Sequence, residues 1–243
     1  MQSWAITDTG NVRTQNQDAY RVEQLDRTTH LLVVCDGMGG AKSGNVASSL
    51  AVDVFVQEMQ YNYNSGLDAA AVDQVMERAV KKANFTVFDQ SRQFPEFSGM
   101  GTTLVAALIR GRSVTVLNVG DSRGYRITSE DIHRITTDHS LAQLMYQRGE
   151  LTAEQLRVFP GKNYITRAVG TEATVQCDIY HQELNRGDFI LLCSDGLTNL
   201  LDDQELLFEV VHGVSKKNCC QRLLNIAKNR GAPDNVTVVL AQV

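Results

Sequence analysis

Two stretches of this chain are apolar at almost every position and then run directly into acidic residues. Residues 31–35 (LLVVC) precede Asp36, and residues 189–193 (FILLC) precede Ser194 and Asp195. A strand that faces water on one side alternates apolar and polar residues, whereas a strand that is apolar throughout is covered on both faces. The chain is therefore expected to fold around buried sheets whose strands deliver carboxylates at their ends.

Strand and helix patterns extend along the whole chain. Strands are predicted at 2–8, 20–35 with a turn at 26–29, 102–109, 114–119, 124–128, 131–135, 175–182, 188–193 and 236–243. Helices are predicted at 47–55, 67–93, 202–212 and 217–229, and residues 138–170 are the least regular part. Strands from both halves of the chain, with helices in pairs between them, favour two packed sheets flanked by helices, an α+β fold. The length of 243 residues fits one domain, 1–243.

Composition narrows the class of protein. Lys and Arg number 23 against 28 Asp and Glu, without a basic run, so nucleic acid is not an expected partner. The five cysteines form no CxxC pair, which predicts reduced thiols in a cytoplasmic protein. No signal peptide or apolar stretch of membrane-spanning length is visible, so no membrane association is expected.

Four aspartates stand where apolar strands are predicted to start or stop, namely Asp36, Asp121, Asp195 and Asp234. A lone Asp-Gly is most simply a turn residue that binds its own backbone. Four such residues indicate instead a site for Mg²⁺ or Mn²⁺, which favour oxygen ligands and can bind as a pair about 4 Å apart around a shared water. If the substrate is a phosphate ester, a bidentate Arg would hold its oxygens, and Arg13 is available close in sequence to Asp18.

Eight short motifs in sequence order resemble those of the metal-dependent protein phosphatase (PPM) family. They are TDTGNVRTQNQD (7–18), DGMGG (36–40), MGTT (100–103), VGDSRGYR (119–126), TTDHS (136–140), RAVG (167–170), LLCSDGL (191–197) and DNVTVV (234–239). The chain is especially similar to the bacterial serine/threonine phosphatases of that family. The resemblance implies an αββα sandwich, in which two packed, mainly antiparallel sheets are flanked by pairs of helices, with a binuclear Mn/Mg centre at one end.

The resemblance also implies roles for individual residues. Asp36 would bridge both ions and the Gly37 carbonyl would bind the second, while Asp195 and Asp234 would complete the first, supported by Asp18 through water. Asp121 together with Asp195 would offer a third, weaker metal position. The catalytic set is thus Asp36, Asp195, Asp234 and Arg13, with Arg13 as the phosphate-binding residue, and residues 145–168 would form a flap beside the substrate groove.

Two positions depart from the family pattern. Gln17 stands where many members of the family carry Glu. The groups around the second ion therefore carry one negative charge fewer. Met38 and Ala41 occupy the places where relatives carry a His proposed as general acid, so either a water on the metal or another residue would protonate the leaving oxygen. We interpret His139 as a structural hydrogen-bonding residue, because it stands beside Asp138 at a predicted loop-to-helix junction, and Asp138 as a supporting or structural group. Ser194 is interpreted as a packing or supporting residue, because no nucleophile elbow or matching base accompanies it.

The function implied is hydrolysis of phosphoserine and phosphothreonine by water activated between two ions, without a phosphoenzyme. Expected partners are phosphorylated proteins and a cognate bacterial Ser/Thr kinase, and the expected oligomeric state is a monomer. Two alternatives remain at this point: a noncatalytic relative that binds phosphorylated partners, and a two-metal nuclease or small-molecule phosphoesterase. The retained acidic cluster argues against the first, and the negative net charge argues against a nuclease.

Overall fold

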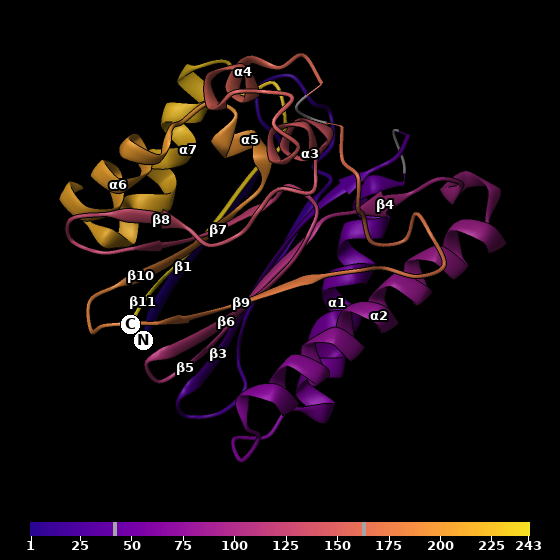
Figure 1. Cartoon of the computed structure of the whole chain (residues 1–243), viewed down its shortest axis with the longest axis horizontal. Helices are drawn as coiled ribbons and strands as arrows, with labels where there is room; N and C mark the ends of the chain where they lie inside the picture. Colours follow the sequence, from indigo (N-terminus) through magenta and orange to yellow (C-terminus); the bar gives the residue numbers. More distant parts are fainter. Residues whose placement is uncertain (41–42, 162–163) are drawn as a thin grey trace.

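Two antiparallel β-sheets pack face to face at the centre of the protein (Figure 1). This computed structural model describes residues 1–40, 43–161 and 164–243. The first sheet has the order β1 (Gln2–Asp8), β11 (Val236–Gln242), β10 (Phe189–Cys193), β7 (Arg123–Ile127) and β8 (Ile132–Arg134). The second has the order β2 (Asp18–Gln24), β3 (Thr29–Met38), β5 (Leu104–Arg110), β6 (Ser113–Val119) and β9 (Asp178–Glu183), with β4 (Gly101–Thr102) paired to β3.

A pair of helices covers the outer face of each sheet. The second sheet carries α1 (Gly44–Asn62) and α2 (Ala69–Gln93), and the first carries α6 (Asp203–His212) and α7 (Cys219–Asn229). Capping residues start two of them: Asp68 accepts the Ala71 N–H, and Asp202 forms a reciprocal capping box with Glu205. Single 3₁₀ turns lie at Pro95–Phe97 and Lys216–Asn218.

The all-apolar strands are buried on both faces, as predicted. In β3, Leu31 and Val33 pack against α1 and α2, whereas Leu32 and Val34 point to the layer between the sheets. In β10 the residues alternate in the same way between the α6–α7 layer and the inter-sheet layer. The predicted αββα sandwich is therefore confirmed, with one core layer between the sheets and one under each helix pair.

The structure differs from the sequence prediction around Asp36. The strand expected to end there continues to Met38, because Gly37 and Met38 pair with Thr102 and Gly101 of β4. The strand expected at 102–109 is correspondingly split between β4 and β5 at Thr103. A four-residue helix, α5 (Asp195–Thr198), also follows β10 directly. Asp36 therefore lies inside a strand, which fixes its backbone more firmly than a turn would.

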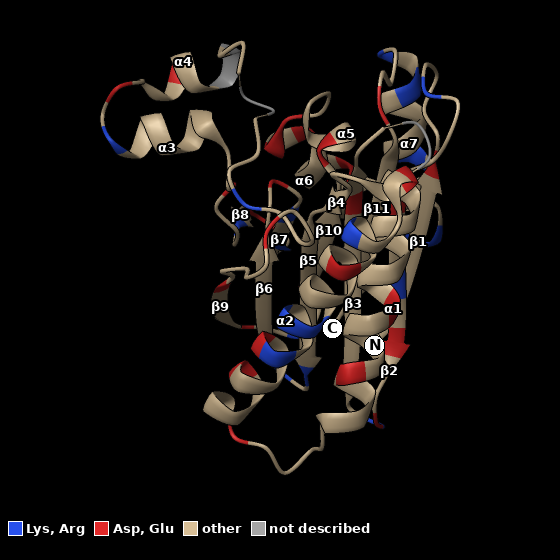
Figure 2. Ribbon diagram, turned by 90° about the vertical axis from the view of Figure 1, so that its right-hand side faces the viewer, with Lys and Arg blue, Asp and Glu red and all other residues tan. Residues whose placement is uncertain are grey.

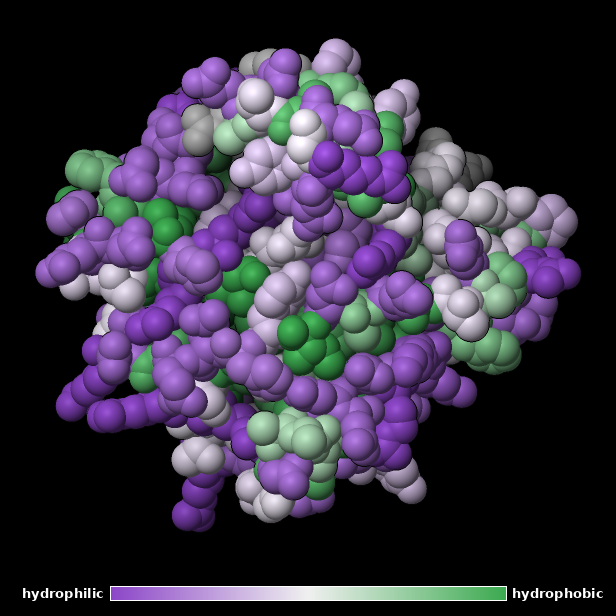
Figure 3. Space-filling model, in the orientation of Figure 1, coloured by the Kyte–Doolittle hydropathy of each residue, from purple (hydrophilic) through white to green (hydrophobic). Residues whose placement is uncertain are grey.

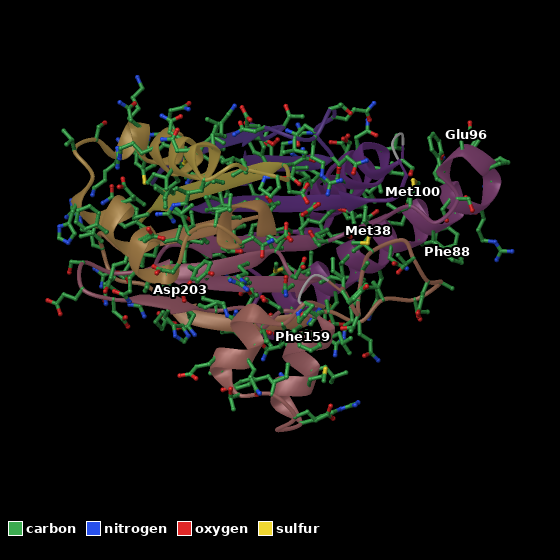
Figure 4. All side chains as sticks on the ribbon, turned by 90° about the horizontal axis from the view of Figure 1, so that it is seen from above. Met38, Phe88, Glu96, Met100, Phe159 and Asp203 are labelled. Carbon is green, nitrogen blue, oxygen red and sulfur yellow. The ribbon has the colours of Figure 1, made fainter. Side chains whose placement is uncertain are left out.

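The irregular part of the chain forms a protruding segment. Helices α3 (Leu141–Gln147) and α4 (Ala153–Val158) stand clear of the sandwich layers (Figure 4). We call residues 140–161 the α3–α4 segment; it contains most of the predicted flap at 145–168, of which residues 162–163 lie outside the described part. All five cysteines carry free thiols, and no helix in the described ranges is long and apolar enough to cross a membrane.

Candidate active site

Five aspartates from distant parts of the chain come together at one end of the sandwich. They are Asp18 at the start of β2, Asp36 in β3, Asp121 after β6, Asp195 at the start of α5 and Asp234 before β11. Asp18 and Asp36 are opposite one another in the β2–β3 pairing, and the charges of Asp18, Asp195, Asp121 and Asp234 all raise the pKa of Asp36 after its burial. Figure 2 shows acidic segments gathered around α5. The structure thus joins all five predicted carboxylates.

Asp18 is held in the cluster by two hydroxyl groups. Its Oδ2 accepts hydrogen bonds from the hydroxyls of Ser194 at 2.7 Å and Thr237 at 2.6 Å, while its Oδ1 is buried without a hydrogen-bond partner in the part of the chain that is described. Burial raises the pKa of Asp18 to about 7, and the charges of Asp195 and Asp234 add to the effect. An unpartnered buried oxygen is costly in a native protein unless a ligand or an ion meets it.

The backbone of Asp36 is held on both sides by the threonines of the MGTT motif. Its N–H donates to Oγ1 of Thr103 at 2.9 Å, and its carbonyl accepts from Oγ1 of Thr102 and from the Thr103 N–H, each at 2.9 Å. Burial raises the pKa of Asp36 well above its ordinary value, with the charge of Asp18 the next cause. MGTT therefore positions this carboxylate, a role that the sequence motif alone did not reveal.

Asp195 is placed by close contact between α5 and the chain before β11. A Cβ on Gly196 would lie 1.9 Å from the carbonyl oxygen of Asn235, so only glycine permits this approach. Asn199 donates to the Asp195 carboxylate at 2.9 Å. Burial, followed by the charge of Asp234, raises the pKa of Asp195. The Gly of this Asp-Gly pair thus serves a backbone contact at the site.

Asn235 ties the first motif to the last, and sequence reasoning missed it. Its Oδ1 accepts the N–H of Gln17 at 2.7 Å, and its Nδ2 donates to the carbonyls of Thr9 and Gln15, each at 3.0 Å. It is 4% exposed. These three bonds bring the loop that carries Arg13 beside Asp234. The signal available in the sequence was an Asn directly after a strand-edge Asp.

Arg13 lies at the open side of the cluster. Its Nη2 donates to Oδ2 of Asp234 at 2.9 Å, and its side chain is 54% exposed. This bond to Asp234 raises the pKa of Arg13, with smaller contributions from the charges of Asp36 and Asp195. A permanently charged, bidentate donor therefore faces solvent next to the carboxylates.

The Gly37 region is tightly packed. The Gly37 N–H donates to the Gln17 carbonyl at 3.0 Å, and a Cβ on Gly37 would lie 2.0 Å from the Gly44 carbonyl oxygen. The Gln17 side chain donates from Nε2 to the Gly40 carbonyl at 3.4 Å. Met38 pairs with Gly101 of β4, and Ala41 is outside the described residues. Gln17 is thus engaged with the turn before α1.

Asp121 connects the cluster to a cavity. It is 7% exposed, its Oδ1 has no partner among the described residues, and burial followed by the charge of Asp195 raises its pKa well above the ordinary value. The cavity measures about 830 Å³ and lies between the α3–α4 segment and the α5–α6 region. Its lining includes Asp121, Arg123, Asp195, Gln143, Tyr146, Leu156, Asn199, Asp202 and Asp203. This groove opens beside two of the five carboxylates.

The site fits divalent cations by its donor chemistry. It offers carboxylate oxygens, two of them buried without partners among the described residues. Burial and, after it, mutual repulsion raise the pKa of these carboxyl groups, and positive ions would compensate both effects. Within the described ranges, no three His, Cys, Asp or Glu side chains are grouped tightly enough to bind one ion together. Ions at this site would therefore keep several water ligands, as Mg²⁺ does.

Three residues interpreted as structural are fully engaged by protein groups. Ser194 donates to Asp18 at 2.7 Å and accepts the Thr237 N–H at 3.0 Å, so its buried hydroxyl is held between two protein groups. Asp138 forms a bidentate pair with Arg123, with its closest contact at 2.7 Å. Both ring nitrogens of His139 have partners. These contacts agree with structural roles.

Comparisons with known proteins identify the family. The model of the Protein phosphatase 2C family matches residues 11–226. Serine/threonine phosphatase stp of Listeria monocytogenes is 33% identical over 239 residues, covering 97% of this chain and 93% of that protein. Protein phosphatase PhpP of Streptococcus pneumoniae is 33% identical over 246 residues, covering 98% and 96%. The crystal structure of serine/threonine phosphatase Stp1 from Staphylococcus aureus matches with a TM-score of 0.93 at 35% identity, covering 99% and 94%. The chain therefore belongs to the protein phosphatase 2C family, as a serine/threonine phosphatase of the bacterial PPM type.

Proposed function

We propose that the acidic cluster binds two Mn²⁺ or Mg²⁺ ions and that this chain hydrolyses phosphoserine and phosphothreonine in proteins. Asp36, Asp195, Asp234 and the Gly37 carbonyl would hold the ions, Asp18 would support them through water, and Asp121 would bind a weaker third ion. The observation that carries the proposal is the convergence of five carboxylates, of which Asp18, Asp36, Asp121 and Asp195 have raised pKa values and two have a buried oxygen without a partner among the described residues.

The ions, when bound, supply an acidified water nucleophile and neutralise charge on the phosphoryl group. The protein groups do the positioning. Arg13 is held beside Asp234 and presents its guanidinium to solvent, where it can bind two phosphoryl oxygens. Asp36 stays in place because Thr102 and Thr103 hold its backbone, so the carboxylate needs little reorganisation during the reaction.

The groove beside Asp121 and Asp195 is the proposed path for the polypeptide around the phosphorylated residue. It has apolar contacts from Leu156 and Tyr146 and polar ones from Asn199 and Asp203, which suits an extended peptide with mixed side chains. The partners would be phosphoproteins made by a cognate Ser/Thr kinase. On this proposal the protein acts as a cytoplasmic monomer; the face in Figure 3 is mostly hydrophilic, with hydrophobic residues in small separate patches.

The test is phosphate release from an aryl phosphate and from a phosphothreonine peptide, with Mn²⁺, with Mg²⁺ and with EDTA. We expect turnover of both substrates that is lost in EDTA. Because Met38 and Ala41 replace the family's His, we also expect a marked preference for the aryl phosphate, whose leaving group needs little protonation. Metal binding without turnover of either substrate would favour the alternative of a noncatalytic phosphoprotein-binding relative.

A further inference from the structure

A second group of buried and half-buried polar side chains lies at the base of the α3–α4 segment. It consists of His139, Asp178 and Arg167. His139 is 6% exposed, and its Nε2 lies 3.2 Å from Oδ2 of Asp178. Arg167 donates from Nη1 to the other oxygen of Asp178 at 2.8 Å. The proposed chemistry uses none of these three residues.

His139 holds the residue that precedes Asp121 by two hydrogen bonds. Its backbone N–H donates to the Gly120 carbonyl at 2.9 Å, and its ring Nδ1 accepts the Gly120 N–H at 3.1 Å. Because Nδ1 is an acceptor, the ring proton is on Nε2, where it faces Asp178. Burial lowers the pKa of His139, which favours this neutral tautomer. Each ring nitrogen therefore has its own partner. We call the Nδ1 bond to Gly120 the first arm and the Nε2 contact with Asp178 the second arm.

The second arm leads to the base of the α3–α4 segment. The carbonyl of His139 accepts the Thr166 N–H at 2.8 Å, and Ser140 pairs with Ile165 in an antiparallel bridge. The two chain ends that bound the segment therefore lie side by side. Asp178 of β9 binds His139 from one end and Arg167 from the other, so a single carboxylate attaches both ends to the second sheet.

We propose that His139 is a positioning residue that joins the Asp121 loop to the base of the α3–α4 segment, with Nδ1 setting the loop and Nε2, through Asp178, setting the segment. The groove lies between these two parts, since Asp121 is in its floor and Tyr146 in its wall. The effect on catalysis rests on the proposed function. The geometry implies that one imidazole, that of His139, fixes the position of the Tyr146 side of the groove relative to Asp121.

Two substitutions separate the arms. In His139→Asn, the side-chain oxygen can take the place of Nδ1 and still accept the Gly120 N–H, but the contact with Asp178 is lost. In His139→Gln, the longer amide reaches the Nε2 position, but the buried Gly120 N–H loses its acceptor. Asp178→Ala removes the second arm from a half-exposed residue, with its side chain 39% exposed, and therefore with less risk to folding.

Hydrogen–deuterium exchange of the metal-free variants, followed by mass spectrometry, measures directly how well each of the two regions is held in place. We expect His139→Asn and Asp178→Ala to speed amide exchange in peptides covering 140–147 and 164–168, while the peptide covering 118–122 stays protected. His139→Gln should show the reverse pattern. A buried hydrogen bond left unmade costs about 1–3 kcal/mol, so exchange in the affected peptide should accelerate about 5- to 100-fold.

Kinetics with Mn²⁺ provide the functional readout. His139→Asn and Asp178→Ala should raise KM for a phosphopeptide at least about fivefold, by loss of a hydrogen bond to a charged group, and should raise KM for an aryl phosphate much less. His139→Gln should instead lower kcat for both substrates and raise the Mn²⁺ concentration needed for half-maximal activity. The matched control is His181→Gln, because His181 on β9 forms the same kind of pair with Asp73 at 3.1 Å but is 51% exposed and outside the groove.

Identical exchange and kinetic patterns in His139→Asn and His139→Gln would overturn the proposal, because they would show a merely structural histidine. Changes of equal size in the His181 control would do the same. If the wild type releases no phosphate from any substrate, the proposed function fails, but the exchange patterns still decide whether His139 joins the two regions.

Discussion

The acidic cluster and the α3–α4 segment border the same groove but are built in opposite ways. Each carboxylate of the cluster is attached to a strand, a strand edge or a short helix whose backbone is bound by buried groups such as Thr103 and Asn235. The α3–α4 segment consists of two short helices outside the sandwich, and it exposes Leu141 and Tyr146. On the proposed function, the difference would give the chemistry a fixed geometry and substrate recognition an adjustable wall.

The largest effect should come from the fixed side, in Asp36→Asn. Loss of the central carboxylate would remove a shared metal contact, so kcat should fall at least about 10³-fold for the aryl phosphate and the peptide alike. Circular dichroism and the melting temperature should stay near the wild-type values, because removing one of five repelling charges does not weaken packing. An active Asp36→Asn enzyme would show that the Asp36 carboxylate is not needed for catalysis.

The electrostatic strain of the cluster should appear in the metal-free protein. The pKa of Asp18 is raised to about 7, and those of Asp36, Asp121 and Asp195 are also raised. A carboxyl with a raised folded-state pKa contributes stability that is present below its unfolded pKa, near 4, and that is lost as pH rises through the folded value. The metal-free protein should therefore be more stable at pH 5 than at pH 7.5.

We expect the melting temperature in EDTA to fall by at least about 5 °C between these pH values, since a tenfold change in proton affinity is worth about 1.4 kcal/mol. His139 and His30 oppose the trend, because burial lowers the pKa of each and this adds stability as pH rises through 6.5, but they are two groups against four. Mn²⁺ should restore the loss at pH 7.5. Greater metal-free stability at pH 7.5 than at pH 5 would show that these carboxyl groups do not have the raised pKa values described.

Asn235→Ala tests the tie between the first and last motifs. Three buried hydrogen bonds are removed, so the free energy of unfolding should fall by about 2–4 kcal/mol and the melting temperature by about 5–15 °C. Asn225→Ala is the control, since Asn225 on α7 bonds only the exposed Gln221 side chain among the described side-chain contacts. Equal effects of the two substitutions on stability would show that Asn235 does not tie the first motif to the last.

Arg13→Ala should have a smaller and more selective effect. The guanidinium contacts Asp234 and faces solvent, so its loss should raise KM about tenfold for both substrates and leave kcat within a few-fold. Arg21→Ala, which breaks an exposed pair with Asp53, is the matched control. An unchanged KM in Arg13→Ala would exclude Arg13 from phosphate binding.

The smallest effect should come from the adjustable wall, in Tyr146→Ala. This side chain is 41% exposed and lines the groove, so we expect KM for a phosphopeptide to rise about threefold, a loss below 1 kcal/mol that is typical of a peripheral contact. The aryl phosphate should be affected less. Tyr61→Ala, at a residue 89% exposed on α1, serves as control. A larger effect of Tyr146→Ala than of Asp36→Asn on kcat would contradict this order of effects.

The sequence predicted the parts of this molecule that depend on local pattern. The strands around Leu31 and Leu191 were recognisable because they are apolar on both faces, and the acids after them stood out by contrast. The bonds that orient those acids were not predictable. The Thr103 hydroxyl reaches Asp36 across 67 residues, and the Asn235 amide reaches Gln17 across 218. Such contacts have no local periodicity and become visible only when the sheets are assembled.

The strand order of the first sheet has a consequence for biosynthesis. Strand β11 lies between β1 and β10, so the sheet stays open until β11 has been inserted. Asp234 and Asn235 arrive with that strand. A nascent chain on the ribosome would therefore carry four of the five aspartates without a finished site, and phosphatase activity would begin only after the final insertion.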